Sequence, residues 1–329
     1  MNVLSLANGY PPSALVDRPG RAQGARCRAR AIRAMKGAML ANDRSLVGPD
    51  GGLIAYRVEG RGPAMVLTNG ITTSNFFWSY LHRRWQRHHT VINWDLKGHG
   101  RSAPARSPEA VTIPALAEDL LRVLDAAGGA RATLVGFSMG CQICLEAYRL
   151  APDRVDAMVL LLGGAGRVFD AALGPLGKLL HGGISRMSTR SFTIGLRGLQ
   201  RVVGSPIAYR LGRSLRLLGR EAGRADVQRI VEHFVRDLDP ATLASMAMAA
   251  QEHSAEDLLP QITVPTLLVG GDRDVFAPGA RVAAQMQGKI PGSELLRLPY
   301  GTHTSLVEHH AEIGAAVDDF LHRRLSQKT

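Results

Sequence analysis

Short apolar runs alternate along this chain with segments whose apolar residues recur at helical spacing. Period-2 alternation predicts a strand over 53–58, and apolar runs bounded by turn residues predict strands at 64–68, 90–96, 132–135, 155–162, 266–269 and 294–298. Helical spacing predicts helices over 113–126, 141–150 and 306–325. Strands that alternate with helices of roughly 10–15 residues indicate a parallel sheet covered on both faces. The predicted fold class is therefore α/β, with a doubly wound, mostly parallel β-sheet.

The alternation breaks off after Gly164. Residues 165–255 keep apolar residues at helical spacing but lose the strand pattern, and glycine and proline interrupt them repeatedly. We therefore expect a helical cap or lid over 165–255, inserted between two core segments, 46–164 and 256–329. Residues 1–45 contain proline, glycine and an arginine-rich patch without a sustained apolar face. We expect them to form a basic, disordered N-terminal extension.

The net charge of +12 is concentrated in the extension and the cap. Residues 1–45 and 165–255 each carry an excess of six positive charges, whereas the rest of the chain is neutral in sum. Because 35 of the 40 basic residues are arginine, a general compositional bias accounts for them, and a solvated surface without a specific partner is one interpretation. Weak contact with an anionic membrane through the cap or the extension is the other. No nucleic-acid partner is expected.

Hydropathy and cysteine content bear on the compartment. Hydrophobic residues make up 45% of the chain, yet no run approaches the roughly 18 apolar residues that a spanning helix needs. The first residues lack the basic start and apolar stretch of a secretory signal. The three cysteines, Cys27, Cys141 and Cys144, make no disulfide framework. We expect the C-x-x-C pair to be small buried hydrophobic residues. The expected localisation is cytoplasmic.

A candidate nucleophile lies where one predicted strand meets a helix. Residues 136–140 read G-x-S-x-G, with the apolar run 132–135 before them and the helical segment 141–150 after them. In a sharp strand-to-helix turn, Ser138 lies at the tip with its hydroxyl exposed and the Met139 amide beside it. Glycine fits on both sides, because a Cβ there would collide with neighbouring backbone. An ordinary Gly-Ser turn produces the same letters in a chain with 36 glycines, so this motif alone decides nothing.

An acid and a histidine follow two later strands, as a catalytic serine requires. A serine hydroxyl is a weak nucleophile at neutral pH and needs an adjacent base, which needs an orienting partner. Ligands of a doubly wound sheet bind at the carboxyl ends of its strands. The predicted strand 266–269 runs into Asp272 and Asp274, and the strand 294–298 runs into His303. The expected order serine, acid, histidine is therefore present.

Four motifs in this order make the chain resemble the α/β-hydrolase superfamily over about residues 46–325. They read DLKGHGRS at 95–102, GFSMG at 136–140, GDRD at 271–274 and GTH at 301–303. The resemblance is to the branch with a serine nucleophile, which contains esterases and lipases. It implies an α/β-hydrolase fold with a helical cap and a reaction carried by three side chains.

By this resemblance Ser138 is the nucleophile, His303 is the general base and then the general acid, and Asp274 orients the histidine. Such families usually place the carboxylate at the fourth position of G-x-x-D, which is Asp274. Asp272 remains the alternative acid, with a surface or loop-capping carboxylate as its other interpretation. His99 belongs to a turn motif that is structural in the family.

The resemblance also implies an oxyanion hole of two backbone N–H groups aimed at one point. One is the amide of Met139, just after the nucleophile. The other is the amide of Ile71, in the loop after the predicted strand 64–68. Family members often carry His-Gly in this loop, whereas this chain has Asn69-Gly70. How the loop is braced stays open, and the side chain of Asn69 is the candidate.

The implied chemistry is acyl transfer to water without a cofactor. Epoxide hydrolases and haloalkane dehalogenases of this fold attack with aspartate, whereas the strand-to-helix turn of this chain holds Ser138. No H-E-x-x-H motif or phosphate-binding glycine loop occurs, so no metal is expected. The leading hypothesis is a serine hydrolase of carboxylic esters with a small-molecule substrate. An acyltransferase, a cofactor-free haloperoxidase-like enzyme and a non-enzymatic ligand-binding protein are the alternatives.

Overall fold

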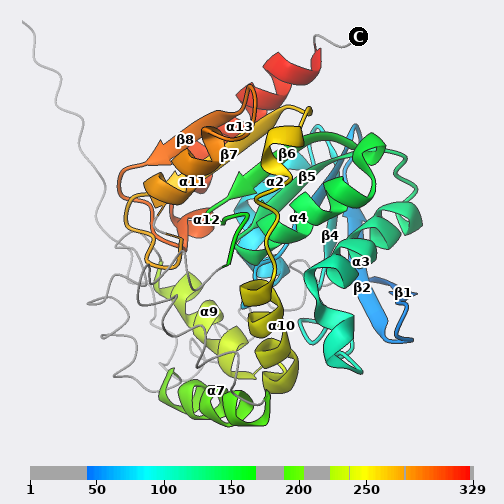
Figure 1. Ribbon diagram of the computed structural model, residues 1–329, viewed down its shortest axis with the longest axis vertical. Coiled ribbons are helices and arrows are strands. Elements are labelled where there is room, and N and C mark those ends of the chain that lie inside the picture. Colours follow the sequence, from blue (N-terminus) through cyan, green and yellow to red (C-terminus); the bar gives the residue numbers. More distant parts are fainter. Residues whose placement is uncertain (1–42, 168–188, 204–222, 237, 278, 327–329) are drawn as a thin grey trace, which may run out of the picture. The chain divides into compact units, whose positions relative to one another are not determined.

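The computed structural model describes residues 43–167, 189–203, 223–236, 238–277 and 279–326 (Figure 1). All of them belong to one compact unit that spans Leu40–Thr329. The predicted N-terminal extension lies outside the described residues, apart from its last three positions. Two long stretches of the predicted cap, 168–188 and 204–222, lie outside them as well.

Within the described residues, eight strands form one sheet in the order β1-β2-β4-β3-β5-β6-β7-β8. The strands are β1 (Arg44–Val47), β2 (Leu53–Glu59), β3 (Ala64–Thr68), β4 (Thr90–Trp94), β5 (Ala132–Phe137), β6 (Val155–Leu161), β7 (Thr266–Gly271) and β8 (Glu294–Leu298). The pairs β1–β2 and β2–β4 are antiparallel, and every other pair is parallel. The predicted α/β class with a mostly parallel, doubly wound sheet is confirmed.

Helices connect the strands of this sheet. They are η1 (Asn75–Trp78), α2 (Ser79–Trp85), η2 (Pro108–Val111), α3 (Ile113–Ala126), α4 (Met139–Leu150), η3 (Pro152–Arg154), α7 (Thr189–Val203), α9 (Arg224–Arg236), α10 (Pro240–Glu252), η4 (Leu259–Gln261), α11 (Gly279–Gln287), α12 (Ser305–Glu308) and α13 (His310–Leu325). The helix predicted over 113–126 is α3, residue for residue. The last predicted helix is divided at His309, so one continuous helix over 306–325 was wrong. No strand falls in the described part of 165–255, which contains α7, α9 and α10.

The first strand was not predicted. β1 begins at Arg44, two residues before the expected start of the core, and pairs with β2 as a hairpin at the edge of the sheet. Three of its four residues are exposed, so this short strand has no alternation of apolar and polar residues from which it could be predicted.

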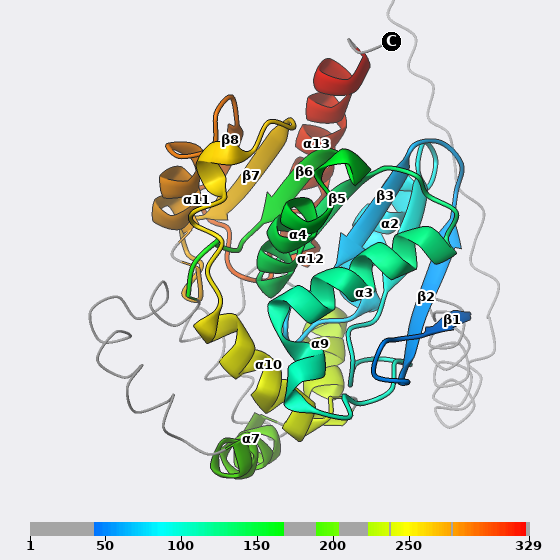
Figure 2. The same cartoon turned by 45° about the vertical axis from the view of Figure 1, so that its right-hand side comes forward.

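The two faces of the sheet build two separate cores. Figure 2 shows α3, α4 and α11 on one face, with α2 and α13 on the other. Because successive side chains of a strand point to opposite faces, neighbouring residues of β3 enter different cores. Val66 packs with α3 and α4, whereas Met65 and Leu67 pack with α2 and α13. This burial on both faces explains the near-continuous apolar runs of the central strands.

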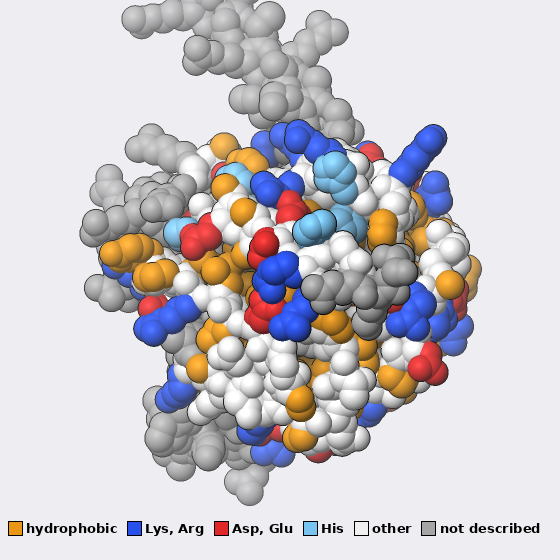
Figure 3. Space-filling model, turned by 90° about the horizontal axis from the view of Figure 1, so that it is seen from above, with side chains coloured by type: hydrophobic (Ala, Val, Ile, Leu, Met, Phe, Trp, Pro, Cys, Tyr) orange, Lys and Arg blue, Asp and Glu red, His pale blue; other side chains and the backbone are white. Residues whose placement is uncertain are grey.

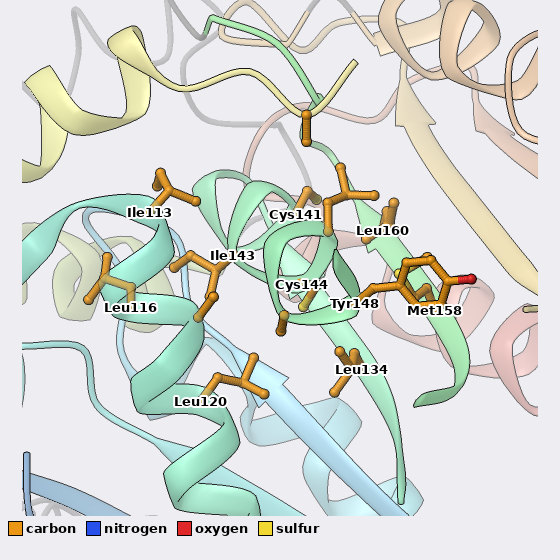
Figure 4. Packing of buried hydrophobic residues seen from close by; sticks show 14 of the residues in the cluster. Ile113, Leu116, Leu120, Leu134, Cys141, Ile143, Cys144, Tyr148, Met158 and Leu160 are labelled. Atoms are coloured by element: carbon orange, nitrogen blue, oxygen red, sulfur yellow. The ribbon is translucent and has the colours of Figure 1, made fainter. Parts of the chain in front are cut away.

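Cys141 and Cys144 lie in the first core, on the side of α4 that faces α3 and the sheet (Figure 4). Both thiols are free and buried among apolar side chains such as Leu134 and Met158. Burial raises the pKa of both thiols, that of Cys144 to about 12. Neither becomes a thiolate near neutral pH, so the expectation of small buried hydrophobic residues is confirmed.

A buried ion-pair cluster anchors the loop that follows β4. Lys97 Nζ lies 3.0 Å from Asp50 Oδ1 in the β1–β2 turn and 2.9 Å from Asp119 Oδ2 on α3. Burial raises the pKa of Asp119 to about 6, although Lys97 lies beside it. The cluster ties the edge hairpin and α3 to the loop that carries His99, and that loop reaches the candidate site.

Charges of both signs are interspersed with apolar side chains on the face shown in Figure 3. The ion pairs of the core segments include Arg323 with Glu294 and Arg154 with Asp125, at 2.7 and 2.6 Å. This mixture accords with core segments whose charges cancel in sum. Among the helices that the structure describes, none is long and apolar enough to span a membrane.

Candidate active site

The turn between β5 and α4 holds Ser138 in a strained backbone conformation. Its φ is 54° and its ψ is −120°, outside the regions that residues with a Cβ ordinarily adopt. Such strain costs of order 1–3 kcal/mol and persists where the surrounding structure enforces it. It projects the serine from the turn at the carboxyl edge of the sheet. The G-x-S-x-G sequence is therefore a sharp strand-to-helix elbow.

Backbone packing enforces the elbow through its two glycines. A Cβ on Gly136 would lie 2.4 Å from the Gly140 carbonyl oxygen, and a Cβ on Gly140 would lie 2.4 Å from the Thr68 carbonyl oxygen. Both contacts are far below van der Waals distance, and both partners are backbone atoms that have no rotamer to change. The collision expected from the sequence is thus present on both sides of Ser138.

Gly140→Ala is expected to lower the free energy of unfolding by roughly 3 kcal/mol, the upper end of the range for overpacking, because α4 must move away from β3. Chemical denaturation followed by circular dichroism measures this loss. Gly198→Ala in α7 is the matched control, since a Cβ there meets no atom within 4 Å in the described chain outside its own helix backbone. The control should be neutral or slightly stabilising. Equal unfolding midpoints for the two variants would contradict the packing argument.

Three side chains from three different loops meet at the elbow. His303 Nε2 lies 3.0 Å from Ser138 Oγ, and His303 Nδ1 lies 2.8 Å from Asp274 Oδ2. Asp274 follows β7, and His303 follows β8. With a carboxylate at Nδ1, the imidazole carries its proton there and leaves Nε2 free to accept the serine hydroxyl. The predicted serine, histidine and acid are therefore brought together in hydrogen-bonding geometry.

The carboxylate of Asp274 is buried and fully engaged. The residue is 3% exposed, and its second oxygen, Oδ1, accepts the backbone N–H groups of Phe276 at 2.9 Å and Ala277 at 3.0 Å. These two bonds fix the plane of the carboxylate. The first oxygen, Oδ2, is thereby presented to the imidazole.

Asp272 lies away from the histidine. Both of its carboxylate oxygens accept from Nε of Arg297 on β8, at 2.7 and 3.0 Å, near the surface. The alternative acid is thus a surface carboxylate paired with an arginine, and Asp274 is the one that contacts His303.

The loop after β3 runs directly beside the elbow. A Cβ on Gly70 would lie 2.9 Å from Ser138 Cβ, so the loop passes against the nucleophile. Asn69 is fully buried and bridges two tryptophans, donating from Nδ2 to the Trp94 carbonyl at 3.0 Å and accepting Trp78 Nε1–H at 2.9 Å. The bracing that the sequence left open is therefore supplied by the Asn69 side chain.

His99, in the loop after β4, contacts the same loop. It is buried, and its Nε2 lies 2.7 Å from the Ile71 carbonyl oxygen while Nδ1 lies 2.9 Å from the Lys97 carbonyl oxygen. Burial lowers the pKa of this imidazole, although its hydrogen bonds to the two backbone carbonyls act in the opposite direction. Both nitrogens contact backbone carbonyls rather than Ser138, which agrees with the structural role expected of this turn motif.

A small cavity opens beside the nucleophile. Ser138, His303, Gln142 and Phe276 line it, together with the glycines that follow β6. The Phe276 ring lies 5.1 Å from the His303 ring and is about half exposed, so it forms an apolar edge of the opening. The cavity therefore offers an apolar wall next to the serine and histidine.

The described helices of the predicted cap contact the core near this site. The Gln142 amide on α4 donates to the carbonyls of Gly166 and Ala250, each at 3.0 Å, and so ties the end of α10 to the elbow helix. From α9, Asp226 accepts the Tyr80 hydroxyl at 3.2 Å. These bonds tie α10 to α4 and α9 to α2 of the core.

Several of these contacts were missed from the sequence. Gln142 lies four residues after Ser138, the spacing that puts two side chains on one face of a helix, and this spacing was the available signal. Phe276 offered no local signal, because its place depends on the turn after β7. The hydroxyl of Thr73 accepts the Gly70 N–H at 2.9 Å, and its position three residues after Gly70 is the spacing of a side chain that caps a turn.

In the described part of the chain, no group of three or more His, Cys, Asp and Glu side chains is placed to hold a metal ion.

A family model described as alpha/beta hydrolase fold matches residues 63–187. That segment contains the loop beside the elbow, the GHG turn and Ser138. Asp274 and His303, which complete the hydrogen-bond relay, follow it in the chain. The chain has the α/β-hydrolase fold.

Solved structures of other proteins superpose on this chain over most of their length. A hydrolase from Pseudomonas aeruginosa PA01 is 25% identical, with a TM-score of 0.65, over 84% of this chain and 97% of the other. The enol-lactonase from Burkholderia xenovorans LB400 is 22% identical, with a TM-score of 0.67, over 84% and 99%. Among curated relatives, a putative carbamate hydrolase, RutD of Stutzerimonas stutzeri (strain A1501), is 26% identical over 82% of this chain and 96% of its own.

Proposed function

We propose that this α/β hydrolase is a serine hydrolase that cleaves a carboxylic ester through an acyl-enzyme intermediate. The observation that carries the proposal is the relay of two hydrogen bonds from Ser138 through His303 to Asp274, at 3.0 and 2.8 Å. A relay of this geometry activates a serine hydroxyl that is otherwise a poor nucleophile. The strained elbow that presents the hydroxyl supports the same role.

In the first half of the reaction, Ser138 Oγ attacks the carbonyl carbon and its proton passes to His303 Nε2. Asp274 stabilises the resulting imidazolium. The negative charge that develops on the carbonyl oxygen is received by the N–H groups of Met139 and Ile71. Met139 is the first residue of α4, where the amide has no partner within the helix. As the C–O bond breaks, the alcohol leaves with the proton from Nε2.

In the second half, water attacks the acyl-enzyme. His303 Nε2 takes a proton from the water as the new C–O bond forms. It returns that proton to Ser138 Oγ as the carboxylic acid departs, which restores the starting state. No redox step or external proton donor is needed, so no cofactor is assigned.

We assign residues 46–164 and 256–329 to the catalytic core and 165–255 to the cap, with the extension before them. The contacts of Gln142 and Tyr80 support a cap that lies over the site. Relatives and neighbours named esterase, enol-lactonase and putative carbamate hydrolase support a small acyl compound as substrate.

A series of p-nitrophenyl esters from acetate to palmitate tests the proposal. We expect hydrolysis with a preference for one range of chain length, and complete loss of it in Ser138→Ala. A fluorophosphonate should label one serine, located by peptide mass spectrometry at Ser138. Turnover that survives Ser138→Ala, or labelling elsewhere, would refute the assignment.

The same assay separates water from other acyl acceptors. With a small alcohol added, a hydrolase still forms mainly the free acid, whereas an acyltransferase forms mainly the new ester. Chromatography of the products at equal p-nitrophenol release measures this partition.

A further inference from the structure

Three side chains fix the backbone of the loop after β3, and they act on different peptide units. Asn69 fixes the start of the loop. His99 contacts the Ile71 carbonyl at 2.7 Å, which belongs to the peptide between residues 71 and 72. The N–H of Ile71 belongs instead to the peptide between Gly70 and Ile71. Its direction therefore depends on what holds the carbonyl of Gly70.

Thr73 holds that carbonyl with two donors. Its backbone N–H and its hydroxyl each lie 3.3 Å from the Gly70 carbonyl oxygen. The same hydroxyl oxygen accepts the Gly70 N–H at 2.9 Å. Thr73 is 6% exposed, so solvent competes little for these bonds. Both backbone polar groups of Gly70 are thus engaged by one residue.

This arrangement determines where the Ile71 amide points. The Gly70–Ile71 peptide is trans, and in a trans peptide the C=O and the following N–H point in opposite directions. Because the Gly70 carbonyl points at Thr73, the Ile71 N–H points away from Thr73. Gly70 lies against Ser138, so the Ile71 N–H, in the peptide that follows Gly70, lies beside the nucleophile.

We propose that Thr73 is a positioning residue for the oxyanion hole: by holding the Gly70 carbonyl, it aims the Ile71 N–H at the oxyanion. The inference rests on the proposed acyl transfer at Ser138 and adds to it. Without the Thr73 hydroxyl, the peptide can rotate and present a carbonyl where a donor is needed. The transition state then loses one of its two donors, while the bound substrate, whose carbonyl carries less charge, is affected less.

Thr73→Val tests the proposal, because it removes the hydroxyl and keeps the branched shape. Loss of one oxyanion donor lowers kcat by about 10²–10³-fold. Since the Thr73 N–H remains, we expect a smaller loss of roughly 10–100-fold in kcat, with KM nearly unchanged. Thr73→Ser, which keeps the hydroxyl, should restore most of the rate. The substrate is the best p-nitrophenyl ester of the series, with rates expressed per serine titrated by fluorophosphonate.

Thr112→Val is the matched control. Thr112 accepts the Ala115 N–H and donates to the Glu109 carbonyl at the start of α3, so it performs a similar turn-capping role away from the elbow. This control should lose stability but keep its kcat per titrated site. If Thr73→Val fails to fold, Thr73→Ala provides the same loss of hydroxyl in a smaller side chain.

Inhibitor binding separates positioning from a general structural effect. A trifluoromethyl ketone adds to a catalytic serine and places an oxyanion in the hole, whereas the methyl ketone of the same chain binds mainly as an intact carbonyl. Thr73→Val should weaken the first by about the same factor as kcat and leave the second within a few-fold. Equal weakening of both ketones, or an unchanged kcat per titrated site, overturns the role of Thr73. Activity that survives Ser138→Ala overturns the proposed function instead.

Discussion

Ser138→Ala is expected to lower kcat for ester hydrolysis by about 10⁶-fold, and His303→Ala should reach a similar residual rate. Nucleophile and base act as one unit, since the hydroxyl attacks only as Nε2 takes its proton across the 3.0 Å contact. Once either group is gone, the other can no longer take part in the attack. The double variant should therefore be no slower than either single variant.

Steady-state kinetics on the best p-nitrophenyl ester measure these rates, with circular dichroism to confirm folding. His322→Ala is the matched histidine control, because His322 lies exposed near the end of α13. It should retain wild-type turnover. If the losses of the two single variants multiplied in the double variant, serine and histidine would be acting in separate steps.

Asp274→Asn is expected to lower kcat by about 10⁴-fold, the size found when the orienting acid of a serine-protease triad becomes an amide. The structure explains why the amide cannot adapt. The N–H groups of Phe276 and Ala277 require an oxygen at the Oδ1 position, so the NH₂ of the new side chain must face His303. Nδ1 then has to accept, the proton moves to Nε2, and the ring can no longer take the proton of Ser138.

Asp272→Asn is the control for this variant, since it changes the same functional group two residues away. It weakens an ion pair with the exposed side chain of Arg297 and leaves both His303 and the Asp274 carboxylate unchanged. We expect kcat/KM within a few-fold of wild type. If Asp272→Asn proved the more damaging substitution, the assignment of the orienting acid would be wrong.

The two acids show where sequence reasoning stopped and geometry took over. Asp272 and Asp274 are two residues apart, so in a continuing strand their side chains would point the same way. The chain instead turns after β7, with the Asp274 N–H donating to the Gly271 carbonyl at 3.1 Å. This turn sends Asp272 to the surface and Asp274 beneath His303. The motif favoured Asp274, but only the turn gives the physical reason.

The bracing of the loop beside the elbow could not be read locally either. Asn69 contacts Trp94, which lies 25 positions further on, and His99 returns from the next loop to contact Ile71. Contacts of this range depend on β3 and β4 lying side by side in the sheet. The sequence shows polar residues in a loop, whereas their partners exist only once the strands have paired.

What the sequence determined by itself was the fold class, the serine and the histidine of the relay, and a choice between two acids for its third residue. Strand and helix periodicities are local, because side chains repeat every two residues along a strand and every 3.6 along a helix. They locate the strand ends, and parallel strands bring those ends to one edge of the sheet. The tertiary structure alone decided the orientation of each group: the strained φ of Ser138, the plane of the Asp274 carboxylate and the direction of the Gly70 carbonyl. These depend on hydrogen bonds and close packing between segments far apart in the chain, for which no local pattern exists.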